Sequence, residues 1–209
     1  MIPVRILARQ FIPNAAPGLC DGLGVSRNRP SLGLITTDCD DATYIALDAA
    51  TKAADVDVCY GRSFYAGAAN ASTPYAGEVI GILSAATPGD LRSGMDAVVS
   101  ALAHIGFCET GGIPYLAHTV SRCGSFLSKE AGVPMGAALA YLIAPPLEAM
   151  VGLDAALKAA DVRLCKFYAP PTETNFGGGL LTGTQSACAA ACAAFRSAVE
   201  KIATIPNEG

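Results

Sequence analysis

Three aspartates stand together early in the chain, directly after an apolar run. Asp38, Asp40 and Asp41 follow SLGLITT (31–37) and precede an alanine-rich stretch. Helix capping explains one or two of them, because short acidic side chains satisfy the free N–H groups of a first helical turn. Three acids exceed that need. Carboxylates at the end of a strand can also act as nucleophiles or magnesium ligands, so the motif could carry chemistry.

The corresponding enzyme would be a haloacid-dehalogenase-like phosphatase, with Asp38 as nucleophile and Asp40 as the neighbouring acid. Such an enzyme also needs a distant lysine and further acids on one continuous sheet. The only histidines are His104 and His118, and neither a Ser-His-Asp nor an HExxH arrangement is present. The glycine-rich run near residue 176 lacks the lysine of a phosphate-binding loop. The phosphatase stays an alternative, and we expect no catalytic residue and no cofactor.

The cysteines are a second group with possible chemistry. Most of the eight stand among Ala, Val or Leu, which favours burial in the core. Cys188 and Cys192 have the i,i+4 spacing of a shared helical metal site, but no histidine lies nearby in the sequence and the flanking alanines suit a packed helix. We therefore expect no metal site.

The chain contains a long internal repeat that must position these residues. LDAATKAADVDVC begins at residue 47, and LDAALKAADVRLC begins at residue 153. A repeat of this length in 209 residues predicts two similar domains, which we place at 1–106 and 107–209.

The same elements are expected in both copies. Each has an apolar strand, an alanine-rich helix that opens on acids or prolines, a Val-rich strand, a loop rich in Gly and small residues, another strand and a second helix. In the first copy the strand is 31–37, the helix 42–54 and the loop 66–77; in the second they are 137–143, 148–160 and 170–179. The predicted fold class is α/β (α+β), with a small antiparallel or mixed sheet and helices in each copy.

Composition excludes several functions. Hydrophobic residues make up 52% of the chain and charged residues 15%, which excludes disorder and predicts tight packing of small residues. The formal charge of −4 comes without a Lys/Arg cluster, which argues against nucleic-acid and anionic-membrane partners. The longest apolar run is too short to span a bilayer and the N-terminus has no signal-like core, so we expect a cytoplasmic protein.

The repeated segments resemble a known protein family. LDAALKAADVRLC is similar to the helix and strand of bacterial microcompartment shell domains, and VSRCGSFLSKEAG (120–132) and PPTETNFGGGLLTGTQSAC (170–188) resemble the EutL-like tandem shell proteins of ethanolamine utilisation. The resemblance covers nearly everything from Ser31 onward. It implies two circularly permuted shell domains in one chain, and a homotrimer that forms a pseudohexameric tile beside other shell proteins in a microcompartment shell.

The resemblance also implies functional residues. A small pore within each chain would bind ethanolamine, whose ammonium group suits carboxylates and an aromatic face. The loops 66–77 and 170–179 would surround and gate a central pore. Lys52 and Lys158 would lie at the tile edge, although pairing with Asp48 and Asp154 on the same helix also explains them. A ligand-sensing regulatory trimer is a further alternative. The residues that would line the small pore are Asp40, Asp41, Glu78, Phe107, Glu148, Thr174, Asn175 and Phe176.

Overall fold

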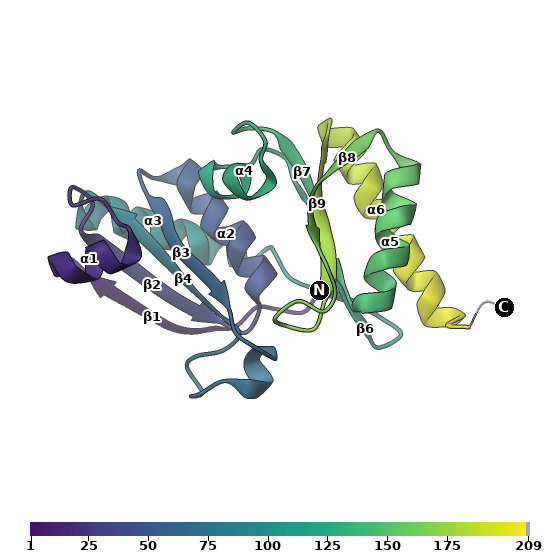
Figure 1. Cartoon of the computed structure of the whole chain (residues 1–209), viewed down its shortest axis with the longest axis horizontal. Helices are drawn as coiled ribbons and strands as arrows, with labels where there is room; N and C mark the ends of the chain where they lie inside the picture. Colours follow the sequence, from purple (N-terminus) through teal and green to yellow (C-terminus); the bar gives the residue numbers. More distant parts are fainter. Residues whose placement is uncertain (208–209) are drawn as a thin grey trace. The chain divides into compact units, whose positions relative to one another are not determined.

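The computed structural model describes residues 1–207, and these form two compact units. The N-terminal unit comprises Val4–Ile105 together with Gly124–Leu127. The C-terminal unit comprises Met1–Pro3, Gly106–Cys123 and the residues from Ser128 onward. In each unit helices pack on a sheet (Figure 1). The predicted boundary between 106 and 107 concerns the two repeated domains and stays a prediction.

The N-terminal unit is built on an antiparallel sheet with the strand order β1-β2-β4-β3. Two long helices and two short helical segments connect or follow its strands. The elements in chain order are β1 (Ile6–Ile12), α1 (Pro17–Leu23), β2 (Ser31–Thr37), α2 (Asp40–Ala53), β3 (Asp57–Ser63), the 3₁₀ helix η1 (Gly67–Asn70), β4 (Val79–Ala85) and α3 (Pro88–Leu102).

The C-terminal unit has the antiparallel strand order β5-β6-β7-β9-β8. Without the short strand β5, this order repeats that of the N-terminal unit. The elements are β5 (Cys108–Thr110), β6 (Ile113–Val120), α4 (Ser125–Ala131), β7 (Ala138–Ala144), α5 (Pro146–Ala159), β8 (Val162–Tyr168), β9 (Gly177–Gly183) and α6 (Gln185–Thr204). The first residues of α4 belong to the N-terminal unit.

The internal repeat extends to a local irregularity of the sheet. The register of β3 against β4 shifts between Val58 and Tyr60, and the register of β8 against β9 shifts between Leu164 and Lys166. A β-bulge bends a strand and changes the direction of its side chains. Both copies therefore share strand order and the same interruption, and the prediction of a repeated α+β unit is confirmed.

The two repeated helices, α2 and α5, combine alanine-rich sequence with acidic residues in the first turn and a lysine in the last turn. Helix α2 has acids in its first turn and Lys52 in its last turn, and α5 has Pro146 and Glu148 at its start and Lys158 at its end. These charges complement the helix dipole. Both helices begin two residues before the predicted ranges 42–54 and 148–160.

Small residues let helices approach the sheet of the N-terminal unit closely. A Cβ atom added to Gly33 would lie 2.9 Å from the Met95 side chain of α3, and one added to Gly81 would lie 2.7 Å from Leu47 of α2. These glycines therefore mark the sheet face that the helices cover. The other face carries a separate apolar cluster of Ala15, Cys20, Val25, Leu32 and Ile82.

The C-terminal unit has the same kind of core. Ala140, Leu142 and Leu181 of the sheet pack with residues of α5 and α6 in one apolar cluster. Gly152 faces the ring of Phe195, which an added Cβ would approach to 2.6 Å. Tight packing of small residues, predicted from composition, is confirmed in this core.

Candidate functional site

The acidic motif lies where β2 leads into α2. Cys39 occupies the N-cap position of α2 without a side-chain capping bond, and Asp40 and Asp41 form the first turn. Both aspartates are buried, each 7% exposed. The Asp41 N–H donates to Asp40 Oδ1 at 2.7 Å. The helix dipole favours acids at this end, but it does not require them to be buried.

Asp38 has a different role from the other two. Its Oδ1 accepts from the backbone N–H of Arg5 at 2.7 Å, and its Oδ2 accepts from Arg5 Nε at 2.7 Å. Both carboxylate oxygens are therefore engaged in a bidentate pair with one residue. This arrangement gives no support to Asp38 as a phosphatase nucleophile.

Glu78 lies beside these aspartates because the backbone on both sides of it is fixed. Its N–H donates to the carbonyl of Thr37 at 2.8 Å, and its own carbonyl accepts from the N–H of Phe64 at 2.8 Å. Gly67 of η1 packs against its carboxyl group, since an added Cβ would lie 2.5 Å from Glu78 Oε1. Glu78 is thus held between the ends of β2 and β3.

The acids perturb one another electrostatically. Burial raises the pKa of Glu78 to about 8, and the charge of Asp40 raises it further, while a hydrogen bond from the Asp40 backbone opposes the shift. Burial also raises the pKa of Asp40, opposed by hydrogen bonds from Ser63 and the backbone of Asp41. Burial likewise raises the pKa of the Cys39 thiol. The pair Asp40 and Glu78 would gain from a cation that compensates both carboxylates.

Ser63 and Tyr44 join the acids through hydroxyl groups that the sequence did not single out. Ser63 Oγ donates to Asp40 Oδ2 at 2.7 Å, and Tyr44 Oη lies 2.7 Å from Ser63 Oγ. Tyr44 is one helical turn after Asp40, and this i,i+4 spacing was the only signal of its proximity. Ser63 ends β3, and its place beside Asp40 depends on the fold.

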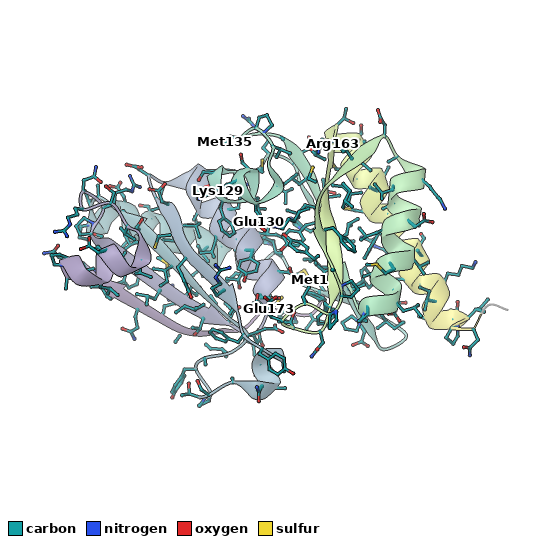
Figure 2. All side chains as sticks on the ribbon, viewed as in Figure 1. Met1, Lys129, Glu130, Met135, Arg163 and Glu173 are labelled. Atoms are coloured by element: carbon teal, nitrogen blue, oxygen red, sulfur yellow. The ribbon has the colours of Figure 1, made fainter. Side chains whose placement is uncertain are left out.

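The other predicted residues belong to the C-terminal unit. The rings of Phe107 and Phe176 meet edge to face with centroids 5.3 Å apart. Asn175 is exposed with φ +68°, and Thr174 is buried. They lie in the loop before β9, near Glu173, which Figure 2 labels.

A tight turn shapes that loop. The Thr172 N–H donates to the Phe176 carbonyl at 2.8 Å, and the Asn175 N–H donates to the Thr172 carbonyl at 3.0 Å. Glu148 stands in the first turn of α5 and is half-buried. The structure therefore brings Asp40, Asp41 and Glu78 together in one unit, and Phe107 and Phe176 together in the other.

The two repeated lysines have diverged. Lys158 Nζ lies 2.6 Å from Asp154 Oδ2, and the two side chains are 75% and 62% exposed. Lys52 Nζ lies 3.2 Å from Asp48 Oδ2, but the Asp48 side chain is fully buried. Asp48 also accepts from the N–H groups of Gly124 and Leu127 at 2.7 and 2.8 Å. The Lys158–Asp154 pair is exposed at the surface. In the other copy, Asp48 holds the segment 124–127 through its two backbone hydrogen bonds.

The cysteines are spread through the core and the sheets. Cys188 and Cys192 are buried in α6, and Cys192 Sγ accepts from Thr119 Oγ1 at 3.4 Å. Within residues 1–207, no group of three His, Cys, Asp or Glu side chains is placed to hold a metal ion. No helix in the same part of the chain has the length and apolar character needed to cross a membrane.

Comparisons with known proteins point to one family, and the relatives and solved structures match nearly the whole chain. The BMC domain family matches residues 31–113. Bacterial microcompartment shell protein EutL of Clostridium perfringens (strain 13 / Type A) is 57% identical, with 99% of this chain and 97% of the relative covered. The crystal structure of ethanolamine utilization protein EutL from Leptotrichia buccalis C-1013-b has a TM-score of 0.97 at 55% identity, and covers 100% of this chain and 98% of that one. A trimeric bacterial microcompartment shell protein, PduB, shares the fold at a TM-score of 0.79 and 21% identity, with 96% and 89% covered.

Proposed function

The chain belongs to the EutL family of bacterial microcompartment shell proteins, and from this membership we propose that three copies form a pseudohexameric tile whose pores pass small cationic metabolites. The coarser function is structural: this is a shell protein, in a family that assembles into microcompartment shells as oligomeric tiles. Two tandem domains of one fold suit such a tile, because three chains then supply six similar domains. The first and second domains of each chain can differ in sequence, which six copies of one domain cannot. Neither the phosphatase nor the regulatory alternative is supported by these relatives.

The trimer and the domain arrangement are parts of this proposal. The repeated strand orders β1-β2-β4-β3 and β6-β7-β9-β8 support two copies of a shell domain, which we place at 1–106 and 107–209 with the permuted connection that the family resemblance implies. The related shell protein PduB is trimeric, which supports a homotrimer for this chain. The loops 66–77 and 170–179 are proposed to gate the central pore, since Ala66, Gly67 and Gly77 have positive φ angles that a local rearrangement can change.

The acid cluster, which comprises Asp40, Asp41 and Glu78, is proposed as the ligand-binding part of the small pore. Its main support is the pairing of a buried Asp40 with a Glu78 whose pKa is raised to about 8. A primary ammonium ion, as in ethanolamine, would compensate both charges and donate hydrogen bonds to them. The proposed contributions of Phe107, Glu148, Thr174, Asn175 and Phe176 rest on the family resemblance and stay predictions.

Ethanolamine binding tests this part of the proposal. We expect weak, millimolar binding by the wild-type protein, because a pore must release what it admits. Glu78→Gln and Asp40→Asn should each weaken it about tenfold or more, since each removes one charge-assisted contact without creating a cavity. Calorimetric titration measures this, with Asp154→Asn as the control for loss of an exposed carboxylate. Equal affinities in all four proteins would contradict the proposal.

Array formation tests the tile edge. Lys158→Asp should leave a trimer of about three times 21.2 kDa, measured by light scattering, but prevent flat hexagonal arrays in electron micrographs. The reason is that its pair with Asp154 is exposed, so the change affects a surface rather than the fold.

The matched variant at the other repeat should behave differently. Lys52→Asp places a second acid beside the buried Asp48, so it should lower thermal stability as well as disturb tiling. Arrays of Lys158→Asp that form as readily as those of the wild type would show that this lysine is only solvated.

A further inference from the structure

A chain of two hydroxyl groups leads to the Asp40 carboxyl group of the acid cluster. Tyr44 Oη lies 2.7 Å from Ser63 Oγ, which donates to Asp40 Oδ2 at 2.7 Å. The other oxygen, Oδ1, accepts from the Asp41 N–H. Ser63 has one hydroxyl hydrogen, and the Asp40 carboxylate receives it. When Ser63 donates this hydrogen to Asp40, Tyr44 is the donor of the bond to Ser63, and this chain together with the Asp41 N–H favours an anionic Asp40.

The position of Tyr44 is itself fixed by packing. Gly61 lies against its ring, and a Cβ added there would come within 3.2 Å of Tyr44 Cε1. The ring of Phe126 packs on it with centroids 6.0 Å apart. A tyrosine held on both sides keeps its hydroxyl in one place, which preorganises the donor to Ser63.

Glu78 meets a different environment. It faces Asp40 on α2 and Asp38 before that helix, and both negative charges raise its pKa, although Arg5 pairs with Asp38. Cys39 between them has a raised pKa and adds no charge at neutral pH. The backbone of Asp40 donates to Glu78, while η1 contributes the uncharged Gly67. Asp40 thus receives donors from Ser63 and Asp41, whereas Glu78 receives one backbone donor and faces two negative charges.

We propose that Ser63, held by Tyr44, is a positioning residue that keeps Asp40 as the permanent anion of the cluster, so that Glu78 holds the proton and releases it to solvent when an ammonium ion binds. The release step rests on the proposed ligand function; the division of charge between the two carboxyl groups does not. Burial raises the pKa of Asp40, and hydrogen bonds from Ser63 and from both the backbone and the side chain of the buried Asp41 oppose that rise. These donors are the observations that favour charge on Asp40.

The proton can be located in the ligand-free protein. Infrared spectra recorded through a pH titration detect protonated carboxyl groups, and ¹³C labelling of glutamate alone moves the glutamate band away from the aspartate bands. In the wild-type protein, the carboxyl that titrates near pH 8 should respond to glutamate labelling and be absent in Glu78→Gln.

Removing the hydroxyl should move this proton. In Ser63→Ala, part of the protonated band should no longer respond to glutamate labelling, and the upper midpoint of the coupled pair should rise by about one pH unit. Tyr44→Phe should show a smaller shift in the same direction, and Ser63→Thr, which keeps the hydroxyl, should titrate like the wild type. If Ser63→Ala titrates like the wild type, or if the wild-type proton responds as an aspartate, the proposal is overturned.

A second measurement separates this inference from the ligand proposal. Ethanolamine affinity measured from pH 6 to 9 should rise up to about pH 8 in the wild type, with proton release detected in buffers of different ionisation enthalpy. Ser63→Ala should bind roughly tenfold more weakly at pH 7, with the gap closing toward pH 9. A gap that is constant with pH would indicate a purely structural serine and overturn the inference. Absence of any ethanolamine binding would contradict the ligand proposal, while the infrared titration would still decide the position of the proton.

Discussion

Replacing Asp48 with alanine is expected to lower the free energy of unfolding by about 3–5 kcal/mol. The Asp48 side chain is fully buried and accepts from the N–H groups of Gly124 and Leu127, besides pairing with Lys52. Alanine would leave those two N–H groups without this acceptor inside the fold. Urea denaturation at one fixed protein concentration measures the loss, because stability of an oligomer depends on concentration.

The repeat supplies a matched control for Asp48. Asp154→Ala removes the corresponding carboxylate of the second copy, where the pair with Lys158 is exposed, and should cost no more than about 0.5 kcal/mol. Asp48→Asn keeps one acceptor oxygen and should fall between these values. Equal losses for Asp48→Ala and Asp154→Ala would mean that the segment 124–127 is held by its apolar contacts alone.

Gly77→Ala is expected to be the second severe substitution, with a loss of about 2–4 kcal/mol. Gly77 has φ +64°, and an added Cβ would collide with the carbonyl oxygen of Thr37. That oxygen accepts from the Glu78 N–H, so the collision would also displace Glu78 from Asp40. Thermal unfolding should therefore shift to lower temperature, and ethanolamine binding should be lost with it.

A second glycine gives the control for Gly77. Gly22 lies in α1 without a positive φ, and nothing lies within 4 Å of an added Cβ. Gly22→Ala should leave stability unchanged or raise it by up to about 1 kcal/mol through helix propensity. A Gly77→Ala protein as stable as the wild type would show that the end of the loop can relax at little cost.

The repeated architecture could be predicted because its strands and helices have local sequence signals and the chain contains one phrase twice. Apolar strands followed by alanine-rich stretches with acids or prolines at their start specify elements regardless of their neighbours, and the doubled phrase linked the two sets. The start of α6 at Gln185 has a weaker signal in the sequence. Alanine and cysteine at 187–194 give little periodic contrast, so the helix has no clear beginning in the sequence.

Residues of the acid cluster were predictable only in part. Asp40 and Asp41 are adjacent in sequence, but their partner Glu78 was identified through resemblance to a family. Ser63 carries no signal of its own, because a serine at the end of a strand is usually a turn residue. Its meeting with Asp40 requires β3 to lie at one edge of the sheet, next to β4, and that pairing is set by contacts distant in sequence.

The same limit applies to Lys52 and Lys158. Their sequence contexts are nearly identical, so pattern alone assigns them one role. The structure separates them, because Asp48 is buried against 124–127 whereas Asp154 is exposed. The two copies of this repeat therefore differ in the burial of the aspartate, although the residue types are the same.

The segment Gly124–Leu127 also bears on how the chain is made. It belongs to the N-terminal unit, although it follows the rest of that unit by nearly twenty residues. During synthesis from the N-terminus, residues 4–105 are added before the backbone groups that Asp48 binds. The contacts of Asp48 with Gly124 and Leu127 can therefore form only after part of the second half has been synthesised.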